Sequence, residues 1–128
     1  MDKLKVVEGY MPFKGYKTWY RTVGENDLGR PPLLTIHGGP GNTHWYLRSL
    51  DELARKYHRQ VIYYDQIGCG YSKAPSNPDM WSAELFEEEL HELRRHLGLE
   101  HVHLLGQSWG GMLELQYATH RPSGVASM

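Results

Sequence analysis

The chain has 128 residues, 40% of them hydrophobic and 23% charged, which is typical of one soluble globular domain with a sizeable core. Fourteen Lys and Arg against fifteen Asp and Glu give a formal net charge of −1, which argues against nucleic acid or an anionic membrane as a partner. The single cysteine, Cys69, excludes an internal disulfide and fits a reducing compartment. The sequence shows no apolar run of membrane-spanning length and no signal-peptide core, so we expect a cytoplasmic protein.

The first third of the chain predicts strands joined by loops. Residues 5–10 and 16–23 are rich in Val, Tyr, Thr and Trp and indicate two strands, connected through residues 11–15. Residues 24–32 are dense in turn formers and indicate a loop. The short apolar run 33–36 then suits a strand that is buried on both faces of a parallel sheet.

A loop with three glycines around one proline follows that strand: His37, Gly38, Gly39, Pro40 and Gly41. Such a loop is stiff yet open, so its backbone N–H groups can approach a ligand closely. It resembles the loop that supplies one oxyanion-hole donor in α/β-hydrolases, and the alternative is an ordinary turn. The Gly39–Pro40 bond is a candidate cis peptide, because only bonds before proline adopt the cis form at low cost.

A helix, a strand and a second loop are expected next. Residues 44–57 predict a helix capped by Asn42 or Thr43, whose sheet-facing positions would be Leu47, Leu50, Leu53, Ala54 and Tyr57. Residues 61–64 predict another buried strand, and in the loop 65–72 we expect the Asp65 side chain to cap the turn.

Two alternatives for the loop 65–72 concern a cofactor and a thiol. The Gly-x-Gly at residues 68–70 lacks the third glycine and the prompt helix of a dinucleotide-binding motif. Cys69 has no base near it in sequence, so a small buried packing residue is a better interpretation than a nucleophile.

Residues 82–97 predict an amphipathic helix closed by Gly98, with an apolar stripe made of Phe86, Leu90, Leu93 and Leu97. A strand over residues 102–105 follows it. His101 and His103 have the spacing of two metal ligands on one face of that strand, but they lie at its start, away from the end where α/β sheets bind ligands. We therefore expect no metal site.

The most informative stretch is residues 106–111, in which Gly106 and Gly110 flank Ser108 at a distance of two residues on either side. A strand precedes this stretch and a helical run, residues 112–118, follows it. This order is typical of the nucleophile elbow, which lifts a serine hydroxyl clear of the sheet. Trp109 would then offer its backbone N–H, at a helix N-terminus, to an oxyanion beside Ser108.

Three motifs stand in the chain in a characteristic order, at residues 37–41, 65–70 and 106–111. Together they resemble the proline iminopeptidases of the α/β-hydrolase fold. The resemblance implies that Ser108 is the nucleophile that attacks the carbonyl after an N-terminal residue, typically proline. It also implies that Gly39 and Trp109 donate to the oxyanion, while His37, Gly38, Pro40 and Gly41 support the donor loop, with no cofactor.

The resemblance also implies a truncated α/β-hydrolase fold. Members are roughly twice as long, and an acid and a histidine follow the serine in their sequences. The one downstream histidine here, His120, would lie about 18 Å from Ser108 along a continuous helix, too far for a base. We therefore expect residues 1–128 to be the N-terminal portion of one domain, with strands 1–5 in the order 1-2-4-3-5, helices on both faces and no lid domain.

Three expectations follow if residues 1–128 are only the N-terminal portion of the domain. Strand five would lie at an open edge, and residues 124–128 would open a sixth strand. Activity on peptides with N-terminal proline would belong to the full-length protein, with the missing half as a continuation or as a separate chain. The alternatives are a related esterase or amidase, or a catalytically inactive fragment.

Overall fold

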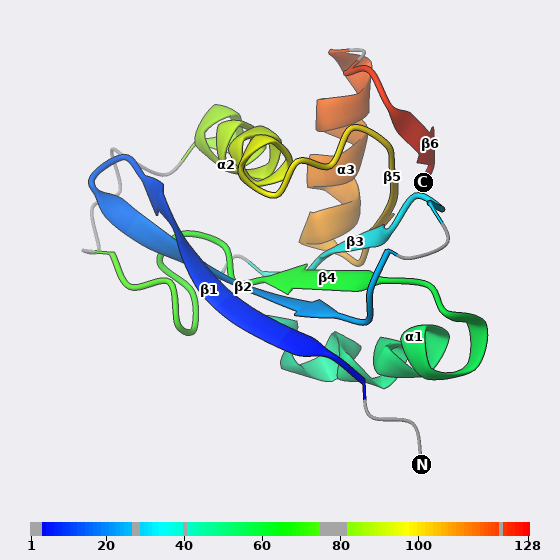
Figure 1. Cartoon of the computed structure of the whole chain (residues 1–128). Helices are drawn as coiled ribbons and strands as arrows, with labels where there is room; N and C mark the ends of the chain where they lie inside the picture. The colour runs from blue at the N-terminus through cyan, green and yellow to red at the C-terminus, as the bar shows by residue number, and fades with distance from the viewer. Residues whose placement is uncertain (1–3, 27–28, 40, 75–81, 121) are drawn as a thin grey trace.

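A computed structural model of the chain describes residues 4–26, 29–39, 41–74, 82–120 and 122–128 (Figure 1). Within these residues one six-stranded sheet has the order β1-β2-β4-β3-β5-β6. Its strands are β1 (Val6–Phe13), β2 (Tyr16–Val23), β3 (Leu33–Ile36), β4 (Val61–Tyr64), β5 (Val102–Gly106) and β6 (Val125–Ser127). The predicted order of the first five strands is confirmed.

The sheet is antiparallel on one side and parallel on the other. β1 pairs with β2, and β2 with β4, in antiparallel fashion, whereas β3 runs parallel to both β4 and β5. The predicted connection at residues 11–15 is too long, because β1 continues to Phe13. Lys14 and Gly15 both have positive φ, 52° and 82°, as a two-residue hairpin turn that matches the strand twist requires.

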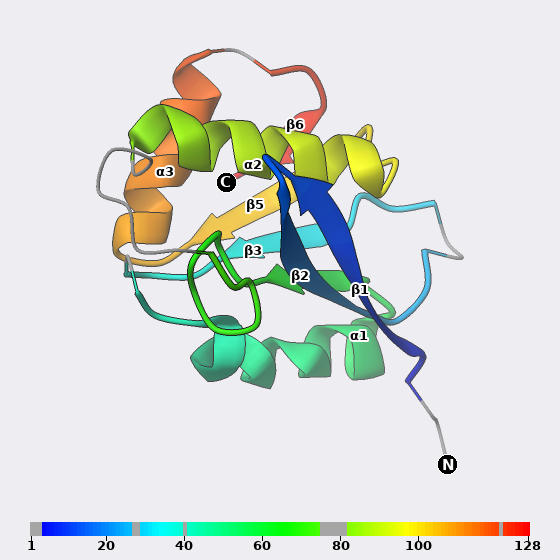
Figure 2. The ribbon, with the colours of Figure 1, turned by 90° about the vertical axis from the view of Figure 1, so that its left-hand side faces the viewer.

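Helices cover both faces of the sheet, as predicted (Figures 1 and 2). The 3-10 helix η1 (His44–Leu50) and the helix α1 (Asp51–Tyr57) lie on one face. The helices α2 (Ala83–His96) and α3 (Trp109–Thr119) lie on the other. Among the helices described, none combines the length and apolarity needed to cross a bilayer.

The single helix expected over residues 44–57 is wrong in two respects. Its first half is the 3-10 helix η1, and Thr43 makes no side-chain capping bond. The start of η1 is held by Asp65 instead, which accepts the backbone N–H of His44 at 3.0 Å. Tyr57 does not face the sheet: it ends α1 just before the left-handed His58, and its side chain is 63% exposed.

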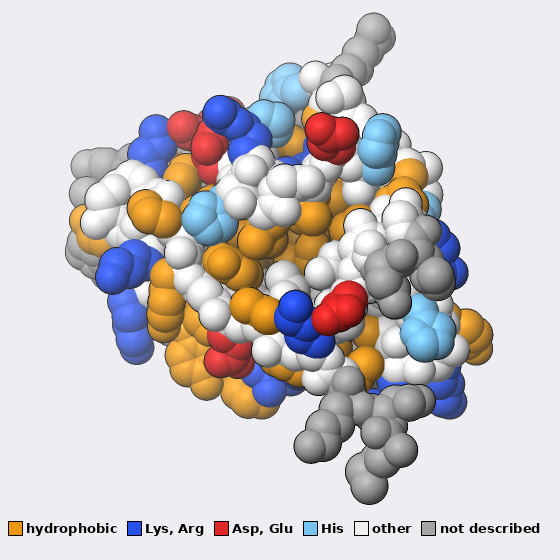
Figure 3. Space-filling model, in the orientation of Figure 1, with side chains coloured by type: hydrophobic (Ala, Val, Ile, Leu, Met, Phe, Trp, Pro, Cys, Tyr) orange, Lys and Arg blue, Asp and Glu red, His pale blue; other side chains and the backbone are white. Residues whose placement is uncertain are grey.

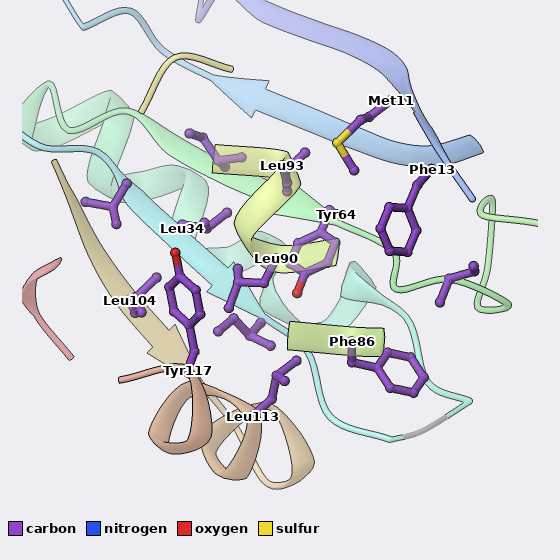
Figure 4. Close-up of a cluster of buried hydrophobic side chains, with 14 residues drawn as sticks. Met11, Phe13, Leu34, Tyr64, Phe86, Leu90, Leu93, Leu104, Leu113 and Tyr117 are labelled. Atoms are coloured by element: carbon purple, nitrogen blue, oxygen red, sulfur yellow. The ribbon is translucent and has the colours of Figure 1, made fainter. Parts of the chain in front are cut away.

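The larger hydrophobic core lies between the sheet and the helices α2 and α3 (Figure 4). Leu34 and Leu104 reach it from neighbouring strands, and Leu90 and Leu113 reach it from the two helices. The predicted stripe of α2 is confirmed, since Phe86, Leu90 and Leu93 are buried and Leu97 packs against them. Ser82 caps α2 by accepting the N–H of Leu85 at 3.1 Å. A smaller cluster fills the α1 face.

β5 is not the edge strand that the sequence led us to expect. β6 pairs with it in parallel, with Val125 opposite Val102. The Arg94 guanidinium helps to hold this pairing, because it donates to the carbonyls of Glu100 and Ser123, at 2.9 Å each, on the segments that lead into the two strands. The prediction that residues 124–128 open a sixth strand is confirmed, and β6 is the edge.

A hollow of about 540 Å³ with an apolar floor opens between the sheet and the end of α2 (Figure 3). Its lining includes Val7, Tyr20, Ile62, Leu97 and Leu99. The residues around it belong to the start of β1, the end of β2 and the approach to β4, so it lies at the amino ends of the parallel strands. The candidate active site lies at the opposite end.

Candidate active site

Ser108 lies at the sharp turn between β5 and α3, as the elbow motif predicts. Its backbone has φ 58° and ψ −120°, a positive-φ conformation that costs a non-glycine residue about 1–3 kcal/mol. The turn is closed by the N–H of Gly110, which donates to the Gln107 carbonyl at 3.0 Å, and by the N–H of Gly111, which donates to the Ser108 carbonyl at 2.9 Å. Ser108 itself is exposed. The sheet and helix therefore hold its side chain towards solvent.

The two elbow glycines are required by close backbone approach. A Cβ on Gly106 would overlap the carbonyl of Gly110, and a Cβ on Gly110 would overlap the carbonyl of Ile36 in the neighbouring strand. Glycine is needed at Gly106 because the helix doubles back against its own strand. The contact with Ile36 adds that α3 also starts against β3.

The glycine-rich loop after β3 lies beside the elbow, because β3 and β5 are parallel neighbours (Figure 2). Ile36 is opposite Gly106, and the backbone N–H of Gln107 donates to the Ile36 carbonyl at 3.2 Å. Gly39 is exposed and has φ 132°, and Gly41 has φ 97°, so both use backbone conformations that favour glycine. Pro40, and with it the predicted cis bond, lies outside the described residues.

His37 is fully buried and both of its ring nitrogens are engaged. Its Nδ1–H donates to the Gly38 carbonyl at 2.6 Å, and its Nε2 accepts the backbone N–H of Gln66 at 3.0 Å. Burial lowers the pKa of His37, although the bond to Gly38 and the charge of Asp65 oppose that shift. His37 is thus held as a neutral ring under the loop, and it has no free lone pair with which to act as a base.

Gln66 joins the two loops from inside the protein. Its side-chain Nε2 donates to the His37 carbonyl at 2.9 Å, and its Oε1 accepts the indole N–H of Trp109 at 3.0 Å. Gln66 is fully buried. Gln66 was not predicted as a site residue, although its position just after β4, within the second motif, was a usable signal. We call His37, Gln66 and Trp109 the inner belt.

Asp65 organises the loop that carries Gln66. One carboxylate oxygen accepts the ring N–H of His44 at 2.8 Å, and the other accepts the backbone N–H of Tyr71 at 3.1 Å. Burial alone would raise the pKa of Asp65, but the bonds from His44 and Tyr71 outweigh it and hold the pKa below its usual value. The prediction that Asp65 caps this turn is confirmed, and Asp65 holds η1 as well.

Glu89 supports the same loop from α2. Its carboxylate is fully buried and accepts bonds from the Thr18 hydroxyl at 2.6 Å and from the backbone N–H of Ile67 at 3.0 Å. Burial outweighs these two bonds and raises the pKa of Glu89 to about 7. No feature of the sequence distinguished Glu89 from the solvent-facing glutamates beside it.

Two other candidates from the sequence lie apart from Ser108. Cys69 is buried, as predicted, and burial raises the pKa of its thiol, which disfavours a nucleophilic thiolate. His120 lies just beyond the far end of α3, where its ring contacts Glu87. Among the residues that the structure describes, no group of three His, Cys, Asp or Glu side chains is arranged to hold a metal ion.

Comparison with known proteins gives a consistent result. Residues 31–128 match the family described as the alpha/beta hydrolase fold. The proline iminopeptidase of Clostridioides difficile is 56% identical over 125 residues, which make up 97% of this chain and 42% of that protein. The proline iminopeptidase of Lactobacillus helveticus is 50% identical over 98% of this chain and 43% of its own length. The chain thus spans about two fifths of these relatives.

Solved structures agree with the observed fold. The crystal structure of a proline iminopeptidase from Mycobacterium smegmatis superimposes with a TM-score of 0.87 at 41% identity, covering 93% of this chain and 41% of that one. The crystal structure of VinJ superimposes with a TM-score of 0.88 at 43% identity, over the same shares of the two chains.

Proposed function

The chain belongs to the α/β-hydrolase-fold family, and from that premise we propose that it is part of a serine aminopeptidase that releases N-terminal proline from peptides. The observation that carries the proposal is the backbone of Ser108, an exposed residue with positive φ at the turn after β5, next to the loop that contains Gly39. Relatives named proline iminopeptidase, 50–56% identical, support the choice of substrate.

In the proposed reaction the Ser108 hydroxyl attacks the carbonyl carbon of an N-terminal proline residue. The backbone N–H groups of Gly39 and Trp109 stabilise the negative charge that develops on the carbonyl oxygen. Trp109 suits this role because it is the first residue of α3, where backbone N–H groups have no acceptor within the helix. The peptide amine then leaves, and water hydrolyses the acyl-enzyme.

Ser108 also needs a general base. His37 does not supply it, since its Nε2 already accepts the N–H of Gln66 and its Nδ1–H is bound to Gly38. His120 lies twelve residues beyond Ser108, across the whole of α3, about 18 Å at ~1.5 Å per residue. We propose that the base and its acid partner come from outside these 128 residues, as a continuation or a second chain, and that the 128 residues alone are inactive.

The test is hydrolysis of L-proline 4-nitroanilide by the protein expressed from the complete reading frame that contains this chain. We expect turnover of this substrate, and a loss of about 10⁴-fold or more in kcat on Ser108→Ala. Ser49→Ala, at an exposed serine of η1, is the control and should retain activity.

Two results would overturn the proposal. Hydrolysis of 4-nitrophenyl acetate without hydrolysis of the proline substrate would indicate an esterase. Failure on both substrates, by a folded protein, would indicate a catalytically inactive member of the family.

A further inference from the structure

Tyr46 connects the two proposed oxyanion loops on the solvent side. Its hydroxyl accepts the backbone N–H of Gly38 at 2.5 Å and donates to the side-chain Oε1 of Gln107 at 2.8 Å. Gly38 precedes Gly39, and Gln107 precedes Ser108. A single hydroxyl therefore touches the residue before the proposed oxyanion donor and the residue before the proposed nucleophile. We call Tyr46 and Gln107 the outer bridge.

The backbone N–H and carbonyl of Gly38 are both hydrogen-bonded, the N–H to Tyr46 on the solvent side and the carbonyl to His37 on the buried side. Its N–H is held by Tyr46, and its carbonyl accepts Nδ1–H of His37 at 2.6 Å. In a planar trans peptide the carbonyl of one residue and the N–H of the next point in opposite directions. Because the Gly38 carbonyl points at the buried His37 ring, the N–H of Gly39 points away from the interior.

The space around the Gly38 α-carbon is tight. A Cβ at this position would lie 3.0 Å from Gln107 Oε1 and 3.2 Å from the Tyr46 hydroxyl, both tighter than ordinary contacts. Glycine at position 38 is therefore what lets the Tyr46 hydroxyl and the Gln107 side chain meet over the loop.

The position of Tyr46 is set independently of the loop that it holds. Tyr46 belongs to η1, whose first residue, His44, is bound to the buried carboxylate of Asp65 through both its backbone N–H and its ring. The ring nitrogen Nε2 of His44 accepts Nε–H of Arg48 at 3.0 Å. The loop after β4 thereby fixes the place from which the Tyr46 hydroxyl reaches Gly38.

From this geometry we propose that Tyr46 is a positioning residue for the oxyanion hole. It fixes the peptide plane between His37 and Gly38 through the Gly38 N–H, and so restrains the following plane, between Gly38 and Gly39, whose N–H would face the reacting carbonyl. Through Gln107 it ties this segment to the elbow. This inference rests on the proposed function. Tyr46 is 43% exposed, whereas His37 and Gln66 are fully buried, so loss of the Tyr46 hydroxyl affects the reaction more than the fold.

The first experiment compares Tyr46→Phe with the unaltered protein from the complete reading frame, on L-proline 4-nitroanilide. We expect kcat to fall about 10-fold with KM changed less than about twofold, because the donor is misplaced mainly in the transition state. Tyr57→Phe, at a 63%-exposed tyrosine at the end of α1, is the matched control and should leave both constants unchanged. An active parent enzyme whose kcat is unchanged by Tyr46→Phe would overturn the inference.

A double-mutant cycle tests the bridge itself. Gln107→Leu removes the acceptor that orients the Tyr46 hydroxyl, so Tyr46→Phe should reduce kcat by less than about threefold in that background. Two independent effects that multiply in the double variant would contradict a shared bridge.

A readout that does not need activity separates this inference from the proposed function. The Gly38 amide should exchange its hydrogen at least about 10-fold faster in Tyr46→Phe than in the unaltered protein, measured by NMR, because its acceptor is lost. Unchanged exchange would refute the inference even if the enzyme proves active. Faster exchange in a protein that hydrolyses no proline substrate would refute the proposed function and leave the hydrogen bond established.

Discussion

The inner belt and the outer bridge hold the same two loops from opposite sides. His37 and Gln66 of the belt are fully buried and Trp109 is half-buried, so the polar groups of His37 and Gln66 would lack water as a replacement partner if a bond were removed. The bridge has bonds of similar length, but both of its residues, Tyr46 and Gln107, are exposed, so water can replace either side chain. A buried group left without a partner costs about 1–3 kcal/mol, whereas an exposed one costs much less. We infer that the belt maintains the fold and that the bridge tunes the reaction.

The largest expected effect concerns the backbone contact between Gly110 and Ile36, where α3 starts against β3. Gly110→Ala would push a Cβ into the carbonyl of Ile36, so it should reduce the free energy of unfolding by more than about 3 kcal/mol, measured by urea denaturation. Gly111→Ala is the matched control. Its Cβ would meet the nearest backbone atom at 3.5 Å, an ordinary contact within α3, so stability should be kept or slightly raised. Equal effects of the two substitutions would contradict the close approach of α3 to β3.

The inner belt is tested by Gln66→Leu. This change leaves the His37 carbonyl and the Trp109 indole N–H without partners in the interior, and we expect a loss of about 2–4 kcal/mol in the free energy of unfolding. Gln60→Leu serves for comparison, because the side-chain bond from Gln60 to the Gly24 carbonyl is long at 3.5 Å. It should cost less than about 1 kcal/mol. If Gln66→Leu lowered the free energy of unfolding no more than Gln60→Leu does, burial would not distinguish the inner belt from more exposed bonds.

The buried carboxylate of Glu89 should make the free energy of unfolding depend on pH, whereas an exposed glutamate should not. The pKa of Glu89 is raised to about 7 in the folded state, so between its unfolded pKa near 4.3 and pH 7 the folded state binds more protons than the unfolded state. Its contribution to stability therefore falls as the pH rises through that window. Glu89→Gln should raise the free energy of unfolding by about 1–3 kcal/mol at pH 8 and change it little at pH 5.

Glu88→Gln, on the exposed side of α2, is the control for that pH series. Glu88 pairs with Lys14 at the surface, at 3.0 Å, so its replacement should have the same small effect at both pH values. A Glu89→Gln effect that does not grow between pH 5 and pH 8 would mean that the buried carboxylate is not neutralised on folding.

The smallest expected effect belongs to the outer bridge. Tyr46→Phe should change the free energy of unfolding by less than about 0.5 kcal/mol in urea denaturation, because water can bind the groups that the hydroxyl releases. A loss comparable with that of Gln66→Leu would erase the distinction between belt and bridge.

Local pattern predicted the elements and the outline of the site. The continuous apolar runs at Leu33–Ile36 and Val61–Tyr64 are strands with the predicted bounds, since strands buried on both faces need no alternation. The amphipathic helix α2 begins one residue after the predicted Ser82. The elbow motif placed Ser108 between a strand and a helix because its glycines report a backbone constraint that is local in sequence.

Long-range contacts explain what local pattern missed. Gln66 acts through bonds to residues 29 and 43 positions away, and the Tyr46 hydroxyl meets Gln107 across 61 positions. No spacing rule encodes such pairs. The start of η1 was missed for the same reason, because it is held by Asp65, 21 residues beyond His44, and not by a side-chain cap at Thr43.

The most direct test of the central claim is mass spectrometry of the protein from the complete reading frame after reaction with a fluorophosphonate. The account predicts one adduct per chain, on the Ser108 hydroxyl, that is abolished by Ser108→Ala and kept in Ser49→Ala. An adduct on another residue, or labelling that survives Ser108→Ala, would contradict it.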